Sequence, residues 1–159
     1  TLFSACGSNK GGITIAVPND TTNEARALLL LEKNEYIKLK SGAGITATIK
    51  DIEENPYNIN FKEVEAAQLP NVLKDVDYAI INSNYAIQAD LNPVGESLLI
   101  EDSSSEYGNI VAVKEGNEGS DSIKALKAAL ESQKVKDFIT EKYDGAVVHH
   151  FPEPSQFGT

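Results

Sequence analysis

The chain has 159 residues and a formal net charge of −10 at pH 7. Hydrophobic residues make up 41% of it and charged residues 24%, a composition typical of a globular protein that excludes an intrinsically disordered chain. The acidic excess argues against nucleic acid or an anionic membrane surface as a partner, because both carry negative charge. An anionic ligand would therefore need a local positive site.

Strand-like and helix-like segments alternate through the first part of the chain, which is typical of an α/β fold with a mostly parallel sheet. Short apolar runs predict strands, and apolar residues at helical spacing predict helices. The continuous run Leu28 to Leu31 should be buried on every side. We expect strands at 13–17, 60–65 and 78–82 and helices at 22–34, 46–55, 67–74 and 84–90.

Beyond residue 92 we expect strands at 97–101 and 109–114, separated by a polar loop. Two amphipathic helices should follow at 121–132 and 135–143, and their apolar stripes predict that both pack on a sheet. The residues that form these stripes are Ile123, Leu126, Ala129, Leu130, Val135, Phe138 and Ile139.

A candidate anion site lies where the first helix follows the first strand. Asn23 and Arg26 fall in the first turns of that helix and, three residues apart, share a face. A helix N-terminus presents unpaired N–H groups and a positive dipole end, and an Arg fork suits a carboxylate. Asn82 follows a neighbouring strand and should meet them at the carboxyl edge of the sheet. The alternative is that Thr21 or Thr22 caps the helix and that Arg26 is solvated.

Signals of catalysis are weak, so we expect no enzyme, no cofactor and no metal site. The adjacent His149 and His150 would point to opposite faces of a strand and cannot form a two-ligand metal site alone. The glycines at 42 and 44 do not form a phosphate-binding loop, and no Ser stands in a nucleophile elbow. Paired acidic residues such as Glu53 and Glu54 are most simply solvated charges.

The single cysteine, Cys6, follows the apolar and small residues LFSA and precedes polar ones, which resembles the end of a bacterial lipoprotein signal. In such signals the cysteine is lipidated and anchors the protein to a membrane. The alternative is an ordinary cysteine near a frayed terminus. No stretch of the sequence approaches the roughly 18 apolar residues of a transmembrane helix.

Six segments together resemble the NlpA-type family, the lipoprotein substrate-binding components of methionine ABC importers. In chain order they are IAVPNDTTNEARALLLL at 15–31, IKDIEENP at 49–56, EVEAAQLP at 63–70, DVDYAIINSNYA at 75–86, YGNI at 107–110 and EKYDGAVV at 141–148. The resemblance implies a periplasmic-binding-protein-like fold of type II with one complete lobe and part of the other. It also implies that the first segment of lobe one, which supplies an aromatic wall for the ligand, is not in this chain.

The same resemblance implies the following organisation. Residues 1–12 would be the end of the lipoprotein signal and a linker, 13–92 the second lobe, 93–151 the crossover and the C-terminal part of the first lobe, and 152–159 a tail.

The function implied is lipid-anchored, extracytoplasmic binding of methionine or a related amino acid or short peptide, delivered to an ABC permease. By resemblance, Arg26 would pair with the ligand carboxylate, and Asn23 and Asn109 would bond the amino-acid backbone, with Asn82 a weaker candidate. The alternative is a lobe that binds no ligand and acts as a structural remnant. The apolar stripes predict self-association, as a homodimer or by strand exchange.

Overall fold

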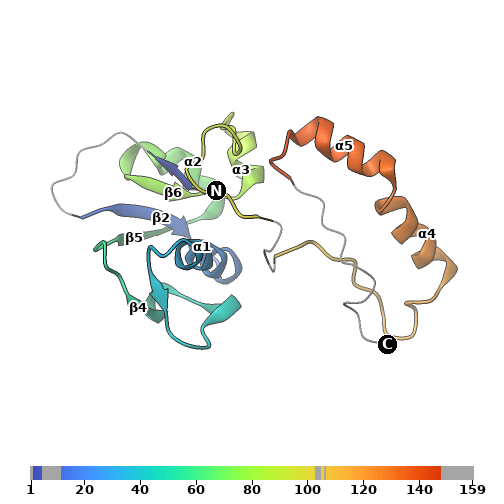
Figure 1. The fold of residues 1–159 in the computed structure, drawn as a ribbon, viewed down its shortest axis with the longest axis horizontal. Helices are drawn as coiled ribbons and strands as arrows, with labels where there is room; N and C mark the ends of the chain where they lie inside the picture. The colour runs from blue at the N-terminus through green and yellow to red at the C-terminus, as the bar shows by residue number, and fades with distance from the viewer. Residues whose placement is uncertain (1, 5–11, 103–104, 106, 148–159) are drawn as a thin grey trace. The chain divides into compact units, whose positions relative to one another are not determined.

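The computed structural model describes residues 2–4, 12–102, 105 and 107–147 (Figure 1). The chain divides into two compact units, Thr1–Glu101 and Asp102–Thr159. This division follows the packing of the chain, whereas the domain limits expected from the sequence follow the lobes of the family, and those limits stay a prediction. Cys6, the two histidines and the tail at 152–159 lie outside the described residues.

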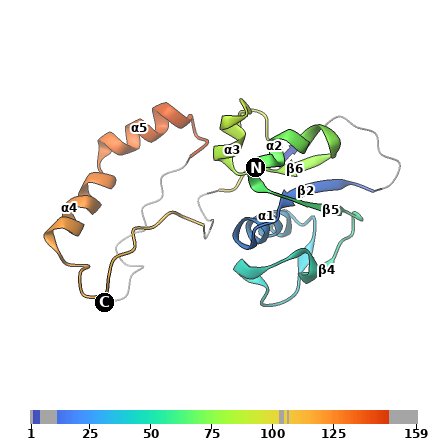
Figure 2. The same cartoon turned by 180° about the vertical axis from the view of Figure 1, so that it is seen from behind.

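A four-stranded, mostly parallel sheet organises the first unit, with strand order β1-β6-β2-β5 (Figures 1 and 2). The central strand β2, Thr14–Pro18, runs parallel to β5, Asn60–Val64, and to β6, Tyr78–Ile80. These three strands confirm the predicted ones to within one or two residues, and the expected α/β class is confirmed with them.

Strand β1, Leu2–Ser4, was not predicted, since the sequence indicates a linker there. It pairs antiparallel with β6, and on its other side the Leu2 N–H donates to the Leu99 carbonyl at 2.9 Å. The strand predicted at 97–101 is wrong, because the structure forms only this single bridge in place of a ladder.

Alternate residues of β2 point into two apolar clusters on opposite faces of the sheet, as the period of a strand requires. Ile15 and Val17 pack in the larger cluster, whereas Ala16 packs in the smaller one with Leu69 and Ala86. The central strand is therefore covered on both faces.

Helix α1, Thr21–Lys33, covers the face of the larger cluster. Leu28 and Leu31 are fully buried there, as expected from the apolar run, while Leu29 is partly buried. The helix is capped by Asp20, whose carboxylate accepts from the backbone N–H of Asn23 at 3.0 Å. The alternative in which Thr21 or Thr22 is the cap is therefore wrong.

The helix predicted at 46–55 is wrong. Two 3₁₀ turns, Gly44–Thr46 and Ile49–Asp51, lead into strand β4, Ile52–Glu54, which pairs antiparallel with β3, Lys38–Leu39. Isoleucine and threonine crowd this segment, and their branched side chains disfavour a helix. The Asp51 carboxylate also accepts from the Thr48 N–H and hydroxyl, both at 2.9 Å, which stabilises a local turn instead.

The remaining helices of the first unit are short. The predicted helix at 67–74 is three successive helical turns, at Ala66–Gln68, Leu69–Val72 (α2) and Leu73–Asp75. Helix α3, Ser83–Gln88, confirms the helix predicted at 84–90 and begins directly after Asn82.

The second unit contains α4, Asp121–Leu130, and α5, Gln133–Tyr143, which confirm the two predicted amphipathic helices. The strand predicted at 109–114 is wrong, and the described part of this unit contains no strand on which the helices could pack. A strand needs a neighbour for its N–H and C=O groups, and here Ile110 is 86% exposed. Leu126, Leu130 and Phe138 of the apolar stripes are also exposed.

Candidate functional site

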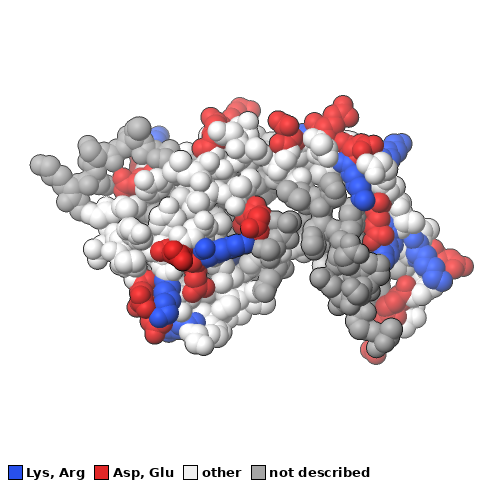
Figure 3. Space-filling view, viewed as in Figure 1, with Lys and Arg blue, Asp and Glu red and all other residues white. Residues whose placement is uncertain are grey.

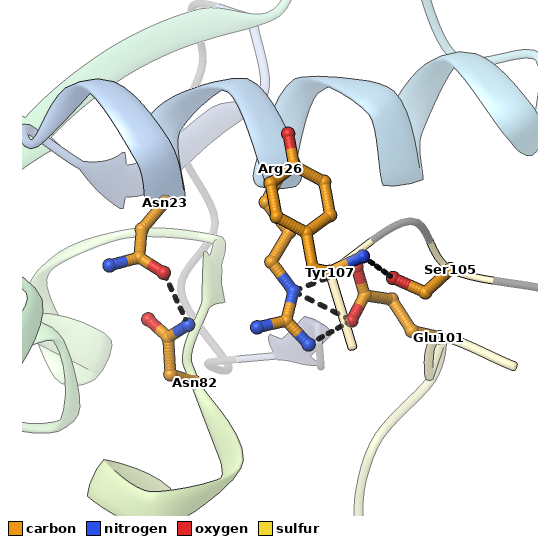
Figure 4. A network of polar contacts seen from close by, with 6 residues as sticks. All are labelled: Asn23, Arg26, Asn82, Glu101, Ser105 and Tyr107. Carbon is orange, nitrogen blue, oxygen red and sulfur yellow. Dashed lines mark hydrogen bonds and ion pairs between the residues drawn. The ribbon is translucent and has the colours of Figure 1, made fainter. Parts of the chain in front are cut away.

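Two predicted site residues meet where parallel neighbouring strands end. Asn23 lies in the first turn of α1, which follows β2, and Asn82 follows β6 and caps α3. The Asn82 Nδ2 donates to the Asn23 Oδ1 at 2.8 Å, across 59 positions of sequence (Figure 4). The carboxyl edge of the sheet therefore brings these two amides together, as the strand order requires.

Asp20 holds the Asn23 side chain in place. Besides capping α1, its two carboxylate oxygens accept from the Asn23 Nδ2, each at 3.0 Å. The amide nitrogen of Asn23 thus faces Asp20, and its carbonyl oxygen faces Asn82. The cap fixes the orientation of this amide.

The amide oxygen of Asn82 stands out within the described residues. Asn82 Oδ1 is buried, and the described residues contribute no hydrogen-bond donor to it. A buried acceptor without a donor costs about 1–3 kcal/mol, so such groups need a specific explanation. A ligand N–H group at this position would satisfy it.

Arg26 lies on α1, and its guanidinium binds the carboxylate of Glu101. The Arg26 Nε donates to Glu101 Oε1 at 2.9 Å and to Oε2 at 2.7 Å, and Nη2 pairs with Oε2 as well (Figure 4). The side chains are 36% and 22% exposed. Arg26 is therefore not merely solvated, and the alternative that treats it so is wrong.

Glu101 is the site residue that sequence reasoning missed. It lies 75 positions from Arg26, at the end of a segment predicted as an ordinary strand, and no local spacing connects the two. A lone acidic residue among many in an acidic chain has no distinguishing pattern. Its partner is visible only in three dimensions.

Glu24, one residue after Asn23, faces the core instead of the site. It is buried, and its Oε1 accepts from the backbone N–H of Ile49 at 2.9 Å, which ties the 3₁₀ turn at 49–51 to α1. Burial raises the pKa of its carboxyl group, and the nearby Glu63 carboxylate raises it further, against the lowering effect of the Ile49 hydrogen bond.

Asn109, the fourth predicted site residue, belongs to the second unit and is exposed. In the same segment, the Tyr107 N–H donates to the Ser105 hydroxyl at 3.3 Å (Figure 4). Asn109 is not among the residues that the first unit brings together, and its role stays a prediction.

Basic and acidic side chains are interspersed on one face of the molecule. On the face drawn in Figure 3, basic side chains of the described residues stand beside acidic ones and form no broad basic patch. Over the described ranges there is no cluster of three or more His, Cys, Asp or Glu suited to a metal ion. In the same part of the chain, every helix is too short or too polar to cross a bilayer.

The fold and this edge define a class: an α/β lobe with amides and a guanidinium gathered at the carboxyl ends of parallel strands, as in periplasmic substrate-binding proteins. The family model described as NlpA lipoprotein matches residues 7–151, and the chain belongs to that family.

Relatives of known sequence and structure agree with this assignment. The chain is 45% identical over 139 residues to outer membrane lipoprotein 3 of Mannheimia haemolytica, covering 87% of this chain and 53% of the relative. It is 40% identical over 139 residues to the D-methionine-binding lipoprotein MetQ of Escherichia coli K12, covering 86% and 51%. The chain thus spans about half the length of the curated relatives that it matches.

Solved structures show the same partial coverage. A nutrient-binding protein from Burkholderia cenocepacia bound to methionine superposes with a TM-score of 0.80 at 42% identity, covering 94% of this chain and 65% of that one. An ABC transporter periplasmic substrate-binding protein from Coxiella burnetii has a TM-score of 0.78 at 44% identity, covering 91% and 63%.

Proposed function

We propose that this protein binds methionine, or a related amino acid or short peptide, and delivers it to an ABC importer in the membrane. The observation that carries the proposal is the convergence of Asn23, Asn82 and Arg26 at the carboxyl edge of the sheet. Membership of the family supports it, since relatives are named for methionine binding. The proposed role is binding without catalysis.

The chemistry of the edge suits an amino acid. The Arg26 guanidinium presents N–H groups in a fork that matches a carboxylate. The buried Asn82 Oδ1 is an acceptor suited to an ammonium group. Asn23, already oriented by Asp20, lies on the same helix as Arg26 and accepts a hydrogen bond from Asn82.

Asn109 of the second unit is the remaining residue to which a ligand contact is assigned. Asn109 is proposed to hydrogen-bond the amino-acid backbone of the ligand, as the family resemblance implies. In proteins of this type the ligand is enclosed between two lobes by hinge closure, and the closed form is what a permease receives.

Arg26→Ala tests the binding proposal. Removing the guanidinium should weaken methionine binding by roughly 2–4 kcal/mol, because a charge-assisted, bidentate interaction is lost. Calorimetric titration of both proteins with methionine measures the change. Lys62→Ala, which removes an exposed cation from β5, is the matched control and should leave the affinity unchanged. Equal affinities of the parent and Arg26→Ala would refute the role of Arg26.

A lipid anchor on Cys6 completes the proposal and would place the protein on the extracytoplasmic face of the cell membrane. Cys6→Ser, expressed in a bacterium behind a full lipoprotein signal, should move the protein from the membrane fraction to the soluble fraction. If both forms fractionate alike, the anchor is not at Cys6.

A further inference from the structure

The Glu101 carboxylate binds the Arg26 guanidinium, which is the group proposed to bind the carboxylate of the ligand. It takes the Nε and Nη2 side of the Arg26 guanidinium in a bidentate arrangement, with Nε–O distances of 2.9 and 2.7 Å. The contacts converge on Oε2, which Nε and Nη2 share, while Nε also reaches Oε1. A ligand carboxylate would compete for these same N–H groups. Glu101 is therefore a chemical mimic of the ligand group.

The charges around this edge do not favour an anion. In the network described above, one cation, Arg26, stands with two carboxylates, those of Glu101 and Asp20. Glu101 neutralises Arg26, and Asp20 is bound to the neutral amide of Asn23. A further carboxylate arriving here meets a site whose positive charge is already balanced. Like charges that share one partner disfavour each other.

We propose that Glu101 is a specificity-determining residue, an internal carboxylate that makes the site select ligands carrying an ammonium together with a carboxylate and reject carboxylates without one. This inference rests on the proposed function and deepens it. A zwitterion brings its own positive charge, which offsets the repulsion from Glu101. Its ammonium also supplies donors for the buried acceptor Asn82 Oδ1, which a simple carboxylate leaves unsatisfied.

The test compares methionine with 4-(methylthio)butanoate, which is methionine without its amino group, by calorimetric titration. The parent protein should bind methionine and bind the butanoate far more weakly. Glu101→Gln keeps the size of the side chain and one hydrogen bond but removes its charge. It should therefore raise the butanoate affinity by roughly tenfold and reduce the difference between the affinities for methionine and butanoate. Glu101→Asp keeps the charge and should keep the selectivity.

A matched control removes the same charge elsewhere in the first unit. Glu53 is half exposed and pairs with Lys38 at 3.2 Å on the β3-β4 pair, so Glu53→Gln changes the net charge equally without touching Arg26. It should leave both affinities as they are. If Glu53→Gln and Glu101→Gln raised the butanoate affinity equally, the effect would come from the overall charge, and the inference would be overturned.

The outcomes separate this inference from the proposed function. If the parent binds methionine and Glu101→Gln leaves the selectivity unchanged, the inference is overturned and the proposed function stands. If the parent binds no methionine, the proposed function fails. The inference then stands only if Glu101→Gln gains affinity for the butanoate and the parent prefers the amine described below to the butanoate. If neither protein binds either ligand, both are overturned.

A measurement on the parent protein alone tests the inference even if the Glu101 variants do not fold. 3-(Methylthio)propylamine is methionine without its carboxylate. The parent should bind this amine more tightly than 4-(methylthio)butanoate, because the edge is acidic and Arg26 is held by Glu101. The reverse order would overturn the inference without any substitution.

Discussion

The two units of this chain carry helices of similar sequence character, yet they differ in what those helices bury. In the first unit, α1 buries Leu28 and Leu31 completely against a four-stranded sheet. In the second unit, α4 and α5 have equally regular apolar stripes, and their described residues include no buried one. An amphipathic pattern therefore specifies a helix, but a core requires a second surface that the pattern does not supply.

The predicted site residues of the two units also differ in how they are held. Asn23 and Arg26 lie on the capped helix α1, Asn82 follows the strand β6, and each of the three has a hydrogen-bond partner within the first unit. Asn109 lies in an exposed segment without regular structure. The positions of the first three are set before any ligand arrives, which lowers the cost of ordering the site.

The largest expected effect is a loss of stability, measured by making the same substitution in a helix of each unit. Leu31→Ala in α1 should lower the free energy of unfolding by about 2–5 kcal/mol, because it leaves a cavity at a side chain that is 0% exposed. Leu130→Ala makes the same change in α4, where the side chain is 41% exposed, and should cost less than about 1 kcal/mol. Urea unfolding followed by circular dichroism measures both. Similar losses would mean that Leu130 is buried in solution.

A second prediction concerns what covers the exposed stripes of α4 and α5. Exposed apolar surface favours association, so we expect a concentration-dependent homodimer or a strand-exchanged assembly. Light scattering over a dilution series measures the mass. Phe138→Ser, at a side chain that is 55% exposed, should shift the protein toward monomer.

The control for this prediction lies in the other unit. Ile45→Ser removes a side chain that is 57% exposed in the first unit, and it should leave the mass unchanged. A parent protein that stays monomeric at every concentration, with one cooperative unfolding transition, would show that the second unit closes its core without a partner copy.

The smallest expected effect comes from Glu24. Its pKa in the folded protein is raised above the ordinary value of 4.5, chiefly by burial, so ionising it costs folding free energy. Its contribution to stability is present below the ordinary value and is lost as the pH rises through the raised value. Glu24→Gln can still accept from Ile49 and should therefore be more stable than the parent at neutral pH, with the difference shrinking as the pH falls toward 4.5.

Urea unfolding of both proteins across this pH range measures that difference. Glu65→Gln removes a carboxylate from an exposed position and should show no such pH dependence. A gain of the same size in Glu65→Gln would assign the effect to the overall acidic charge instead of to burial.

Local pattern was enough for elements whose stabilising contacts are close in sequence. The strands β2, β5 and β6 and the helices α1, α4 and α5 follow from short apolar runs and helical spacing. The segment at 46–55 shows the limit, since its apolar spacing predicts a helix while Thr48, Asp51 and the pairing of β4 with β3 favour turns and a strand. Propensity is a weak prior when a nearby strand competes for the same backbone groups.

For the site, the sequence by itself determined that Asn23 and Arg26 share a helix face and that Asn82 directly follows a strand, because helical period and strand pattern are local properties. The tertiary structure decided that this strand, β6, lies beside β2. The sequence also determined the family, through six ordered segments, and the family model confirms it. Only the tertiary structure decided that Glu101 lies against Arg26, because a salt bridge between residues 75 positions apart depends on how the whole first unit folds. The same reason explains β1, which is too short to be recognised alone and exists through its pairing with β6.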